Sequence, residues 1–349
     1  MKTHKNLFQK VCKFENLYNA YLKARKGKNN TAEVIKFTYN LEDELLKLQH
    51  ELRSQTYKTG KYRHFTIFEP KERRISALPF RDRIVHHAIC NVIESLFDKT
   101  FIYDSYACRK GKGTHAGADR IQKFIRKANS NSYVLKCDIS KYFPSVNHEI
   151  LKQIIREKIS DNELLQLLDQ IVDSPNQENS DEMQEAQNFE HKGLPIGNLT
   201  SQLFANMYLD KLDKYVKYIL GIKYYIRYMD DFVIMHKSKA SLHELKEKVI
   251  LFLVSMRLIM HPKKVDIFPV SLGIDFLGYR TFSNYRLVRK STIKRFLKGV
   301  KIKLKKYDTE IISFDKLMES FNSWEAYMDY GDSYNLQKSL HERYFKNVM

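Results

Sequence analysis

The sequence predicts an α+β fold in which antiparallel strand pairs are backed by helices. Residues 1 to 55 include LEDELLKLQHEL, whose apolar residues recur at i, i+3 and i+4, the period of an amphipathic helix. Residues 62 to 80 alternate like a strand pair around a charged turn at residues 70 to 72. Tyr224 to Tyr228 and Phe232 to Met235 have the apolar and aromatic composition of a second strand pair.

The segments between these strands predict the remaining elements. Helices are expected from residue 80 to about 128, and a short strand at SYVLKCDIS then leads into KYFPSVNHEI and another helix. The stretch from 173 to 192 is polar and acidic, which predicts a solvated loop or insertion. After it, GLPIGNLTSQLFANMYLDKLDKYV changes from a loop into an amphipathic helix, and a further helix is expected near 240 to 257.

The C-terminal part of the chain is strongly basic. Residues 286 to 306 include ten Lys or Arg and no acidic residue. A helix here would bury the apolar residues between Ile293 and Leu304 and leave four lysines exposed, namely Lys294, Lys298, Lys301 and Lys305. Such a face is often only solvated, but this density of positive charge favours contact with phosphates.

Composition narrows the class of protein. The chain has 349 residues, of which 43% are hydrophobic, so a disordered tail is excluded. Lys and Arg number 60 against 41 Asp and Glu, a net charge of +19. This excess favours a polyanionic partner, nucleic acid first and an anionic membrane surface second, and charge alone does not separate the two.

Targeting and metal-binding patterns are weak. The N-terminal MKTHKNLFQK has no apolar core of signal-peptide length and no apolar run approaches a bilayer span, so we expect a cytoplasmic protein without a membrane partner. The four cysteines are widely spaced, which favours reduced thiols. The doublet His86-His87 lies in a helical pattern, where helix packing or nucleic-acid contact is favoured over a zinc site.

The run YIRYMDDFVIM places two aspartates inside an apolar stretch, although strands usually exclude Asp. A tight turn at Met229, Asp230 and Asp231 would expose these carboxylates at the edge of a sheet. Asp138 similarly ends an apolar strand. Three carboxylates at the ends of neighbouring strands would hold two Mg²⁺ ions about 3.5–4 Å apart, the arrangement used for phosphoryl transfer. The alternative is an Asp-Asp pair that only shapes a hairpin.

These residues carry a family resemblance. The YMDD at 228 to 231 resembles the signature of reverse transcriptases, and further blocks follow the family's order between residues 60 and 280. They are PKERRISALPFRDRIVHHAI, DSYACRKGKGTHAG, VLKCDISKYFPSVNHEIL, GLPIGNLTSQLFANMYL, MHPKKV and IDFLGYR. The resemblance implies a right-hand polymerase of fingers, palm and thumb. Its parts would be an N-terminal helical segment at 1–55, fingers and palm at 56–285, and a basic helical thumb at 286–349.

The run IGNLTSQLFAN resembles the reverse transcriptases of diversity-generating retroelements. These enzymes copy a template-repeat RNA into cDNA with errors opposite adenine, a process called mutagenic retrohoming. The resemblance implies template RNA, nascent cDNA, dNTPs and a small basic helical accessory protein as partners. A retron-type or phage-defence reverse transcriptase, and a non-catalytic RNA-binding protein on a polymerase scaffold, are the alternatives.

Residue roles follow from the resemblance and from the chemistry. Asp138 and Asp230 would bridge two Mg²⁺ ions, for which Mn²⁺ can substitute, with the carbonyl of Ile139 as a further ligand and Asp231 in support. Phe143 would pack against the sugar and exclude a 2′-hydroxyl, or else be an ordinary core residue. The other expected nucleotide-binding residues are Lys71, Arg74 (or its equally basic neighbour Arg73), Ile196, Gln202 and Lys264 (or Lys263), and Phe276, Leu277 and Gly278 would form the primer grip.

Overall fold

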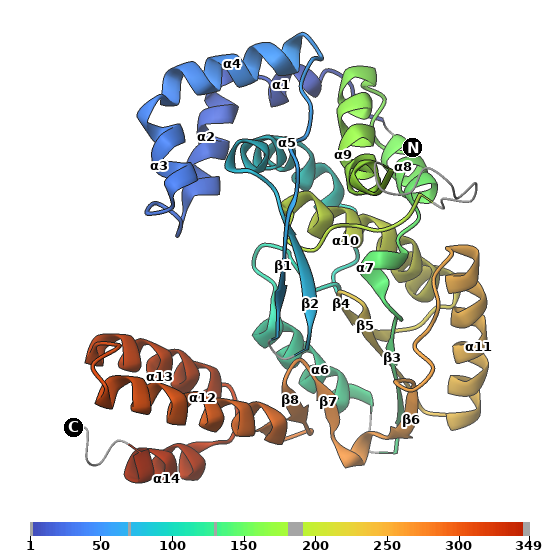
Figure 1. The fold of residues 1–349 in the computed structure, drawn as a ribbon. Helices are drawn as coiled ribbons and strands as arrows, with labels where there is room; N and C mark the ends of the chain where they lie inside the picture. Colours follow the sequence, from blue (N-terminus) through green and yellow to red (C-terminus); the bar gives the residue numbers. More distant parts are fainter. Residues whose placement is uncertain (1–2, 69–70, 129–130, 181–190, 345–349) are drawn as a thin grey trace. The chain divides into compact units, whose positions relative to one another are not determined.

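The computed structural model describes residues 3–68, 71–128, 131–180 and 191–344 (Figure 1). The chain divides into two compact units, which we describe separately. The first comprises Met1–Tyr103, Asp138–Gly221 and Glu247–Lys263, and the second comprises Asp104–Cys137, Ile222–Lys246 and Lys264–Met349.

The first unit begins with helices, as the periodicity of residues 1 to 55 predicts. They are α1 (Phe8–Val11), α2 (Phe14–Arg25), α3 (Ala32–Tyr39) and α4 (Leu41–Arg53), drawn in blue in Figure 1. The long helix α5 (Phe80–Asp98) packs against α2 and against α10 (Leu199–Lys214). Because α5 contacts helices on several sides, ten of its residues are buried.

The predicted strand pair in this unit is confirmed. Strand β1 (Arg63–Ile67) pairs antiparallel with β2 (Arg73–Ala77), with Phe65 opposite Ile75. The expected turn between them includes Pro70, which lies outside the described residues.

Two sequence predictions in the first unit need correction. The polar stretch from residue 173 was expected to be a loop, but α9 (Asn162–Ser180) continues through its first eight residues. The reason is tertiary, since Asp173 accepts a hydrogen bond from Lys152 Nζ at 2.8 Å and lies 3.1 Å from His148 Nδ1. Residues 181 to 190 lie outside the described part of the chain.

The second correction concerns α10, which was expected to be amphipathic and is instead buried on most sides. It packs against both α5 and α8 (His148–Arg156), so its polar residues are buried with partners. Thr200 Oγ1, for example, lies 2.8 Å from His86 Nδ1 of α5. The His86 ring therefore serves helix packing, as favoured from the sequence. The first unit also contains the one-turn helix α7 (Tyr142–Ser145) and the π-helix η1 (Tyr215–Ile219). Helix α11 (Lys239–Ser255), whose residues are divided between the two units, confirms the helix expected near 240 to 257.

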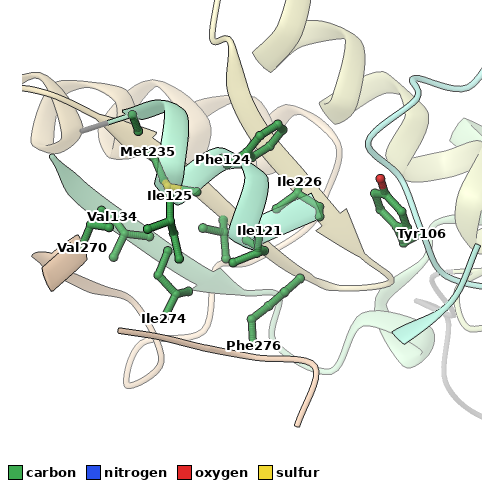
Figure 2. Close-up of a cluster of buried hydrophobic side chains, with 12 residues drawn as sticks. Tyr106, Ile121, Phe124, Ile125, Val134, Ile226, Met235, Val270, Ile274 and Phe276 are labelled. Atoms are coloured by element: carbon green, nitrogen blue, oxygen red, sulfur yellow. The ribbon is translucent and has the colours of Figure 1, made fainter. Parts of the chain in front are cut away.

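The second unit is built on a four-stranded sheet of order β4-β5-β3-β6. Its strands are β3 (Tyr133–Asp138, of which the last residue is counted with the first unit), β4 (Tyr224–Tyr228), β5 (Asp231–His236) and β6 (Asp266–Pro269). Helix α6 (Thr114–Ala128) covers the sheet, and Figure 2 shows its Ile121, Phe124 and Ile125 packed with Val134 and Ile226 of the strands. The strand predictions around 133 and 224 are thus confirmed.

A smaller sheet and a helical C-terminal part complete the second unit. The sheet has the order β7 (Ile274–Phe276), β8 (Tyr279–Thr281) and β9 (Arg286–Val288), preceded by the short 3₁₀-helix η2 (Val270–Leu272). The helices are α12 (Lys290–Asp308), α13 (Phe314–Met328) and α14 (Tyr334–Tyr344). On α12 the predicted faces are confirmed: Val300 is buried, and Lys294, Lys298, Lys301 and Lys305 are exposed.

The class of fold follows from these elements. Helices alternate with small sheets, and every strand pair whose register is given by the described residues is antiparallel. The α+β prediction is confirmed. All four cysteines are free thiols. Among the residues described, no helix has both the length and the apolarity needed to cross a bilayer.

Candidate active site

The turn between β4 and β5 carries the paired aspartates. Tyr228 lies opposite Asp231 in the antiparallel register, so the turn contains only Met229 and Asp230. The sequence predicted three turn residues; Asp231 is instead the first residue of β5. Met229 has φ +55°, a left-handed conformation that two-residue hairpins require and that side chains other than glycine adopt at a cost. The side chains of Asp230 and Asp231 are half-buried.

Asp138 is the last residue of β3, and β3 is the direct neighbour of β5 in the sheet. Asp138 is buried, with 6% of its surface exposed. Beyond the sheet, Ile139 forms an antiparallel bridge with Met260. The bridge uses the carbonyl of Asp138, which accepts from His261 N at 2.8 Å, and the amide of Ser140, which donates to Ile259 O at 2.8 Å. The carbonyl of Ile139 is therefore not consumed by this pairing.

Phe143 lies on α7 in the first unit and is half-buried. Its ring meets the buried Tyr142 ring edge-on at 5.6 Å, and Tyr142 Oη donates to Ala205 O of α10 at 2.6 Å. The carbonyl of Phe143 accepts from Leu194 N at 2.8 Å. This hydrogen bond joins α7 to the loop that contains Ile196.

The loop before α10 is held on its other side by β2. Ser76 N donates to Ile196 O at 2.9 Å. Gly197 has φ +128°, and a Cβ added there would lie 3.0 Å from Ser76 O, so this approach requires glycine. Ile196 is half-buried, while Gln202 is exposed on an otherwise largely buried helix. The first unit thus joins three of the expected nucleotide-binding segments by main-chain hydrogen bonds.

The predicted cations are all exposed. Lys71 precedes β2, and Arg73 and Arg74 are its first two residues, so they project from opposite faces of the strand. Lys263 and Lys264 lie together in the turn before β6, and both are exposed. Exposure therefore allows either Arg73 or Arg74, and either Lys263 or Lys264, to meet a nucleotide.

The expected primer-grip residues form the turn between β7 and β8 in the second unit. Phe276, the last residue of β7, belongs to the buried cluster of Figure 2. Leu277 and Gly278 make the turn with φ +55° and +89°. A Cβ at Gly278 would lie 2.1 Å from the hydroxyl of Tyr327 on α13, so the turn is packed closely against that helix.

Two buried polar side chains have features that were not predicted from the sequence. Arg227, two residues before the turn of β4 and β5, is fully buried. The sequence indicates it only by placing an arginine inside the apolar run YYIRY. His86 is also buried, and its burial lowers the pKa of the ring to about 3, which keeps the ring neutral at physiological pH.

Potential metal ligands also meet in the first unit at residues that the sequence did not single out. Ligand atoms of His148, Asp173 and His191 lie within 4.8 Å of one another. Hydrogen bonds already engage this cluster, since His148 Nε2 is 2.8 Å from Gly193 O and Lys152 binds Asp173. No pattern of ligand spacing in the sequence pointed to it.

Comparisons with known proteins agree with the motif order. The chain is 26% identical over 202 residues to the Putative COX1/OXI3 intron 2 protein of Saccharomyces cerevisiae, covering 55% of this chain and 21% of that protein. It is 25% identical over 276 residues to Protein YkfC of Escherichia coli, covering 68% and 71%. It is 25% identical over 207 residues to Group II intron-encoded protein LtrA of Lactococcus lactis subsp. cremoris, covering 58% and 32%. The chain therefore spans only a fifth to a third of two of these relatives.

Residues 58–281 match the family described as Reverse transcriptase (RNA-dependent DNA polymerase), which is well over half of the chain. The matched range contains β1 and β2, the strand ending at Asp138, the Ile196 loop and the turn at Asp230. The chain belongs to the reverse transcriptase family.

Proposed function

We propose that this chain is an RNA-directed DNA polymerase that extends a primer by two-metal nucleotidyl transfer, with Asp138, Asp230 and Asp231 as the metal-binding carboxylates. One observation carries the proposal: Asp138 ends β3 and Asp231 begins β5, and these strands are neighbours in a chain of the reverse transcriptase family. Carboxylates at the ends of neighbouring strands of one sheet can hold the metal ions that assist phosphoryl transfer.

The donor set fits Mg²⁺, which prefers carboxylate and carbonyl oxygens and for which Mn²⁺ can substitute. Asp138 and Asp230 would bridge two ions, the Ile139 carbonyl would supply a further oxygen, and Asp231 would support the primer end. Bound Mg²⁺ would lower the pKa of the primer 3′-hydroxyl and stabilise the departing pyrophosphate.

The other expected site residues have roles in binding and proton transfer. Phe143 would stack against the deoxyribose and exclude a 2′-hydroxyl by its bulk. Lys71 and Arg74 would grip the triphosphate, and Lys264 would donate a proton to pyrophosphate. The turn at Phe276, Leu277 and Gly278 would position the primer, and the exposed lysines of α12 would contact nucleic-acid phosphates.

The proposed organisation is that of fingers, palm and thumb. The N-terminal helices at 1–55 would precede fingers and palm at 56–285. The basic segment at 286–349, which begins with β9 and continues as α12, α13 and α14, would form the thumb. The change from helices α1 to α4 into strand β1, and from strand β9 into helices α12 to α14, supports this division.

The subclass we favour is the error-prone enzyme of a diversity-generating retroelement. Its support is the run IGNLTSQLFAN, in which Ile196 replaces a polar side chain in the loop and Gln202 is exposed on α10. The enzyme would copy a template-repeat RNA into cDNA, aided by a small basic helical accessory protein.

The intron-encoded relatives favour a second candidate, a reverse transcriptase associated with a mobile intron. The DNA around the gene separates the candidates. A template-repeat and variable-repeat pair supports the retroelement, whereas flanking intron RNA sequence supports the second candidate and a structured RNA gene upstream supports a retron.

Asp230→Asn tests the central proposal. It should abolish extension of a DNA primer on an RNA template and leave RNA affinity within about twofold, because one metal-binding charge is lost while the basic surface is kept. Asp43→Asn, an exposed residue of α4, is the matched control and should extend primers like the wild type. Extension by Asp230→Asn within tenfold of wild type would contradict the two-metal assignment.

A further inference from the structure

Arg227 is the largest side chain that the second unit buries completely. It lies in β4 between Ile226 and Tyr228, in a strand whose other side chains are apolar or aromatic. A guanidinium keeps its charge at any ordinary pH, and burying a charge is strongly unfavourable unless hydrogen bonds compensate it. The contacts of Arg227 therefore indicate what this buried charge stabilises.

One of these contacts is with the turn that carries Asp230. Arg227 Nη1 donates to the carbonyl oxygen of Met229 at 2.9 Å. This carbonyl belongs to the peptide group that joins Met229 to Asp230. Fixing its orientation therefore fixes the plane from which the Asp230 main chain, and with it the carboxylate, departs.

The turn needs such a restraint. Met229 has φ +55°, a region in which a residue with a Cβ is strained. Strained conformations of this kind persist only where the surrounding structure holds them, and they concentrate at functional sites. Without the hydrogen bond to its carbonyl, Met229 could relax and reorient the following peptide.

The second guanidinium nitrogen and the main chain of Arg227 bind the segment from Asp104 to Tyr106. Arg227 Nη2 donates to Ser105 Oγ at 3.2 Å. The main chain of Arg227 pairs with the same segment, since its amide donates to Asp104 O at 2.9 Å and its carbonyl accepts from Tyr106 N at 3.0 Å. The Asp104 carboxylate in turn accepts two hydrogen bonds from Arg120 of α6, at 2.6 and 3.2 Å. The guanidinium thus bridges a rigid segment and the strained turn.

We infer that Arg227 is a positioning residue, which acts through the Met229 carbonyl to hold the Asp230 carboxylate in its metal-binding orientation, with Ser105 as its support. The inference rests on the proposed function, in which Asp230 binds Mg²⁺. It assigns a role in the metal site to a side chain that touches neither metal nor substrate.

The test is single-nucleotide primer extension measured over a range of Mg²⁺ concentrations. Arg227→Met should raise the Mg²⁺ concentration for half-maximal rate about tenfold, which corresponds to about 1.4 kcal/mol. Arg227→Lys should give a smaller rise, because an ammonium keeps the charge but cannot reach both acceptors as a planar fork does. RNA affinity should stay within about twofold for each variant.

Two further variants keep the test decisive if Arg227→Met folds poorly. Ser105→Ala keeps the arginine and removes one anchor, and it should raise the half-maximal Mg²⁺ concentration about threefold. The control is Arg126→Met, which removes an exposed arginine whose Nε donates to Ser283 O at 2.7 Å, and it should leave the Mg²⁺ dependence unchanged. A general effect of losing a guanidinium is thereby excluded.

A double variant examines the mechanism itself. Glycine adopts positive φ readily, so Met229→Gly should make the turn less dependent on its restraint. In that background the shift caused by Arg227→Met should fall from about tenfold to about threefold or less. A purely structural role for the arginine predicts the same shift in both backgrounds.

The outcomes are separable. Suppose that the wild type extends primers and that folded Arg227→Lys and Ser105→Ala show the same Mg²⁺ dependence as the wild type. The inference is then overturned and the proposed function stands. An equal Arg227→Met shift with Met229 and with glycine also overturns it. If the wild type extends no primer with Mg²⁺ or Mn²⁺, the proposed function fails and the inference fails with it.

Discussion

The amide of Ser76 donates a hydrogen bond to the carbonyl oxygen of Ile196 at 2.9 Å, joining strand β2 to the loop before α10. The contact is close because Gly197 follows, where any Cβ would lie 3.0 Å from Ser76 O. On its other side the loop is fastened by Leu194 N to the carbonyl of Phe143. The main chain of this loop is thus restrained at both ends, while the side chain of Ile196 is left half-buried and aliphatic.

Ile196→Gln should lower misincorporation, most visibly opposite template adenines, without abolishing synthesis. An aliphatic side chain offers no hydrogen bond to the nascent base pair, and a hydrogen bond is worth about 0.5–1.5 kcal/mol, so selectivity should improve several-fold to about tenfold. Sequencing cDNA copied from one RNA by both proteins measures this. Ile35→Gln, at an exposed position of α3, is the control, and identical error spectra at position 196 would move the cause of infidelity elsewhere.

Phe143→Ala should increase incorporation of ribonucleotides relative to deoxyribonucleotides by about tenfold or more. The proposed selection is steric, so removing the half-buried ring admits a 2′-hydroxyl, whereas Phe143→Tyr keeps the bulk and should retain the preference. Competition between dNTP and rNTP in single-turnover extension gives the ratio. An unchanged ratio in Phe143→Ala would show that the ring only supports the fold of α7.

Replacing Lys298 and Lys301 by Gln should weaken binding of template-primer duplex and lower its dependence on salt. Each phosphate contact contributes about one unit to the slope of log affinity against log salt, so the slope should fall by about two. The matched control replaces Lys36 and Lys47, which are exposed on the N-terminal helices. The prediction is wrong if both pairs lower the slope equally.

Gly278→Ala should destabilise the second unit by about 1–3 kcal/mol. The residue has φ +89°, and a Cβ there would lie 2.1 Å from the Tyr327 hydroxyl. Gly111→Ala is a matched control, because Gly111 also has a positive φ, of +68°, but has nothing within 4 Å of its added Cβ. Urea unfolding of the two variants separates the steric contribution from the conformational one, and adding Tyr327→Phe should recover part of the loss only at position 278.

The buried His86 should make the protein less stable in mild acid. Its pKa is lowered by burial from 6.5 to about 3, so in the unfolded chain it binds a proton that the folded chain excludes. Its contribution to stability is therefore full above pH 6.5 and is lost as the pH falls from 6.5 toward 3. Between pH 7 and pH 5 this amounts to about 2 kcal/mol.

His86→Asn should flatten this dependence, because an amide can still bond Thr200 and does not titrate. Urea unfolding at pH 7 and pH 5 measures the difference, and His243→Asn on the exposed side of α11 is the control. Equal losses of stability in wild type and His86→Asn would show that other groups govern the acid sensitivity.

Local patterns in the sequence were sufficient for much of the fold. The strands β3 and β4 and the pair β1 and β2 lie where alternation and composition predicted them. The buried and exposed faces of α12 also follow its spacing of apolar residues and lysines. These features depend on side chains a few positions apart, which the sequence displays directly. The block order likewise placed the chain in the family that residues 58–281 match.

Only the tertiary structure decided which polar groups are buried and what they hold. The extension of α9 past Asp173 depends on Lys152 and His148, and the burial of α10 depends on partners such as His86. Arg227 is adjacent to its turn in sequence, yet its anchor, Ser105, lies 122 residues away. The desolvation of a polar group is offset by partners from distant segments, so its burial is set by the packing of the whole unit and not by its neighbours along the chain.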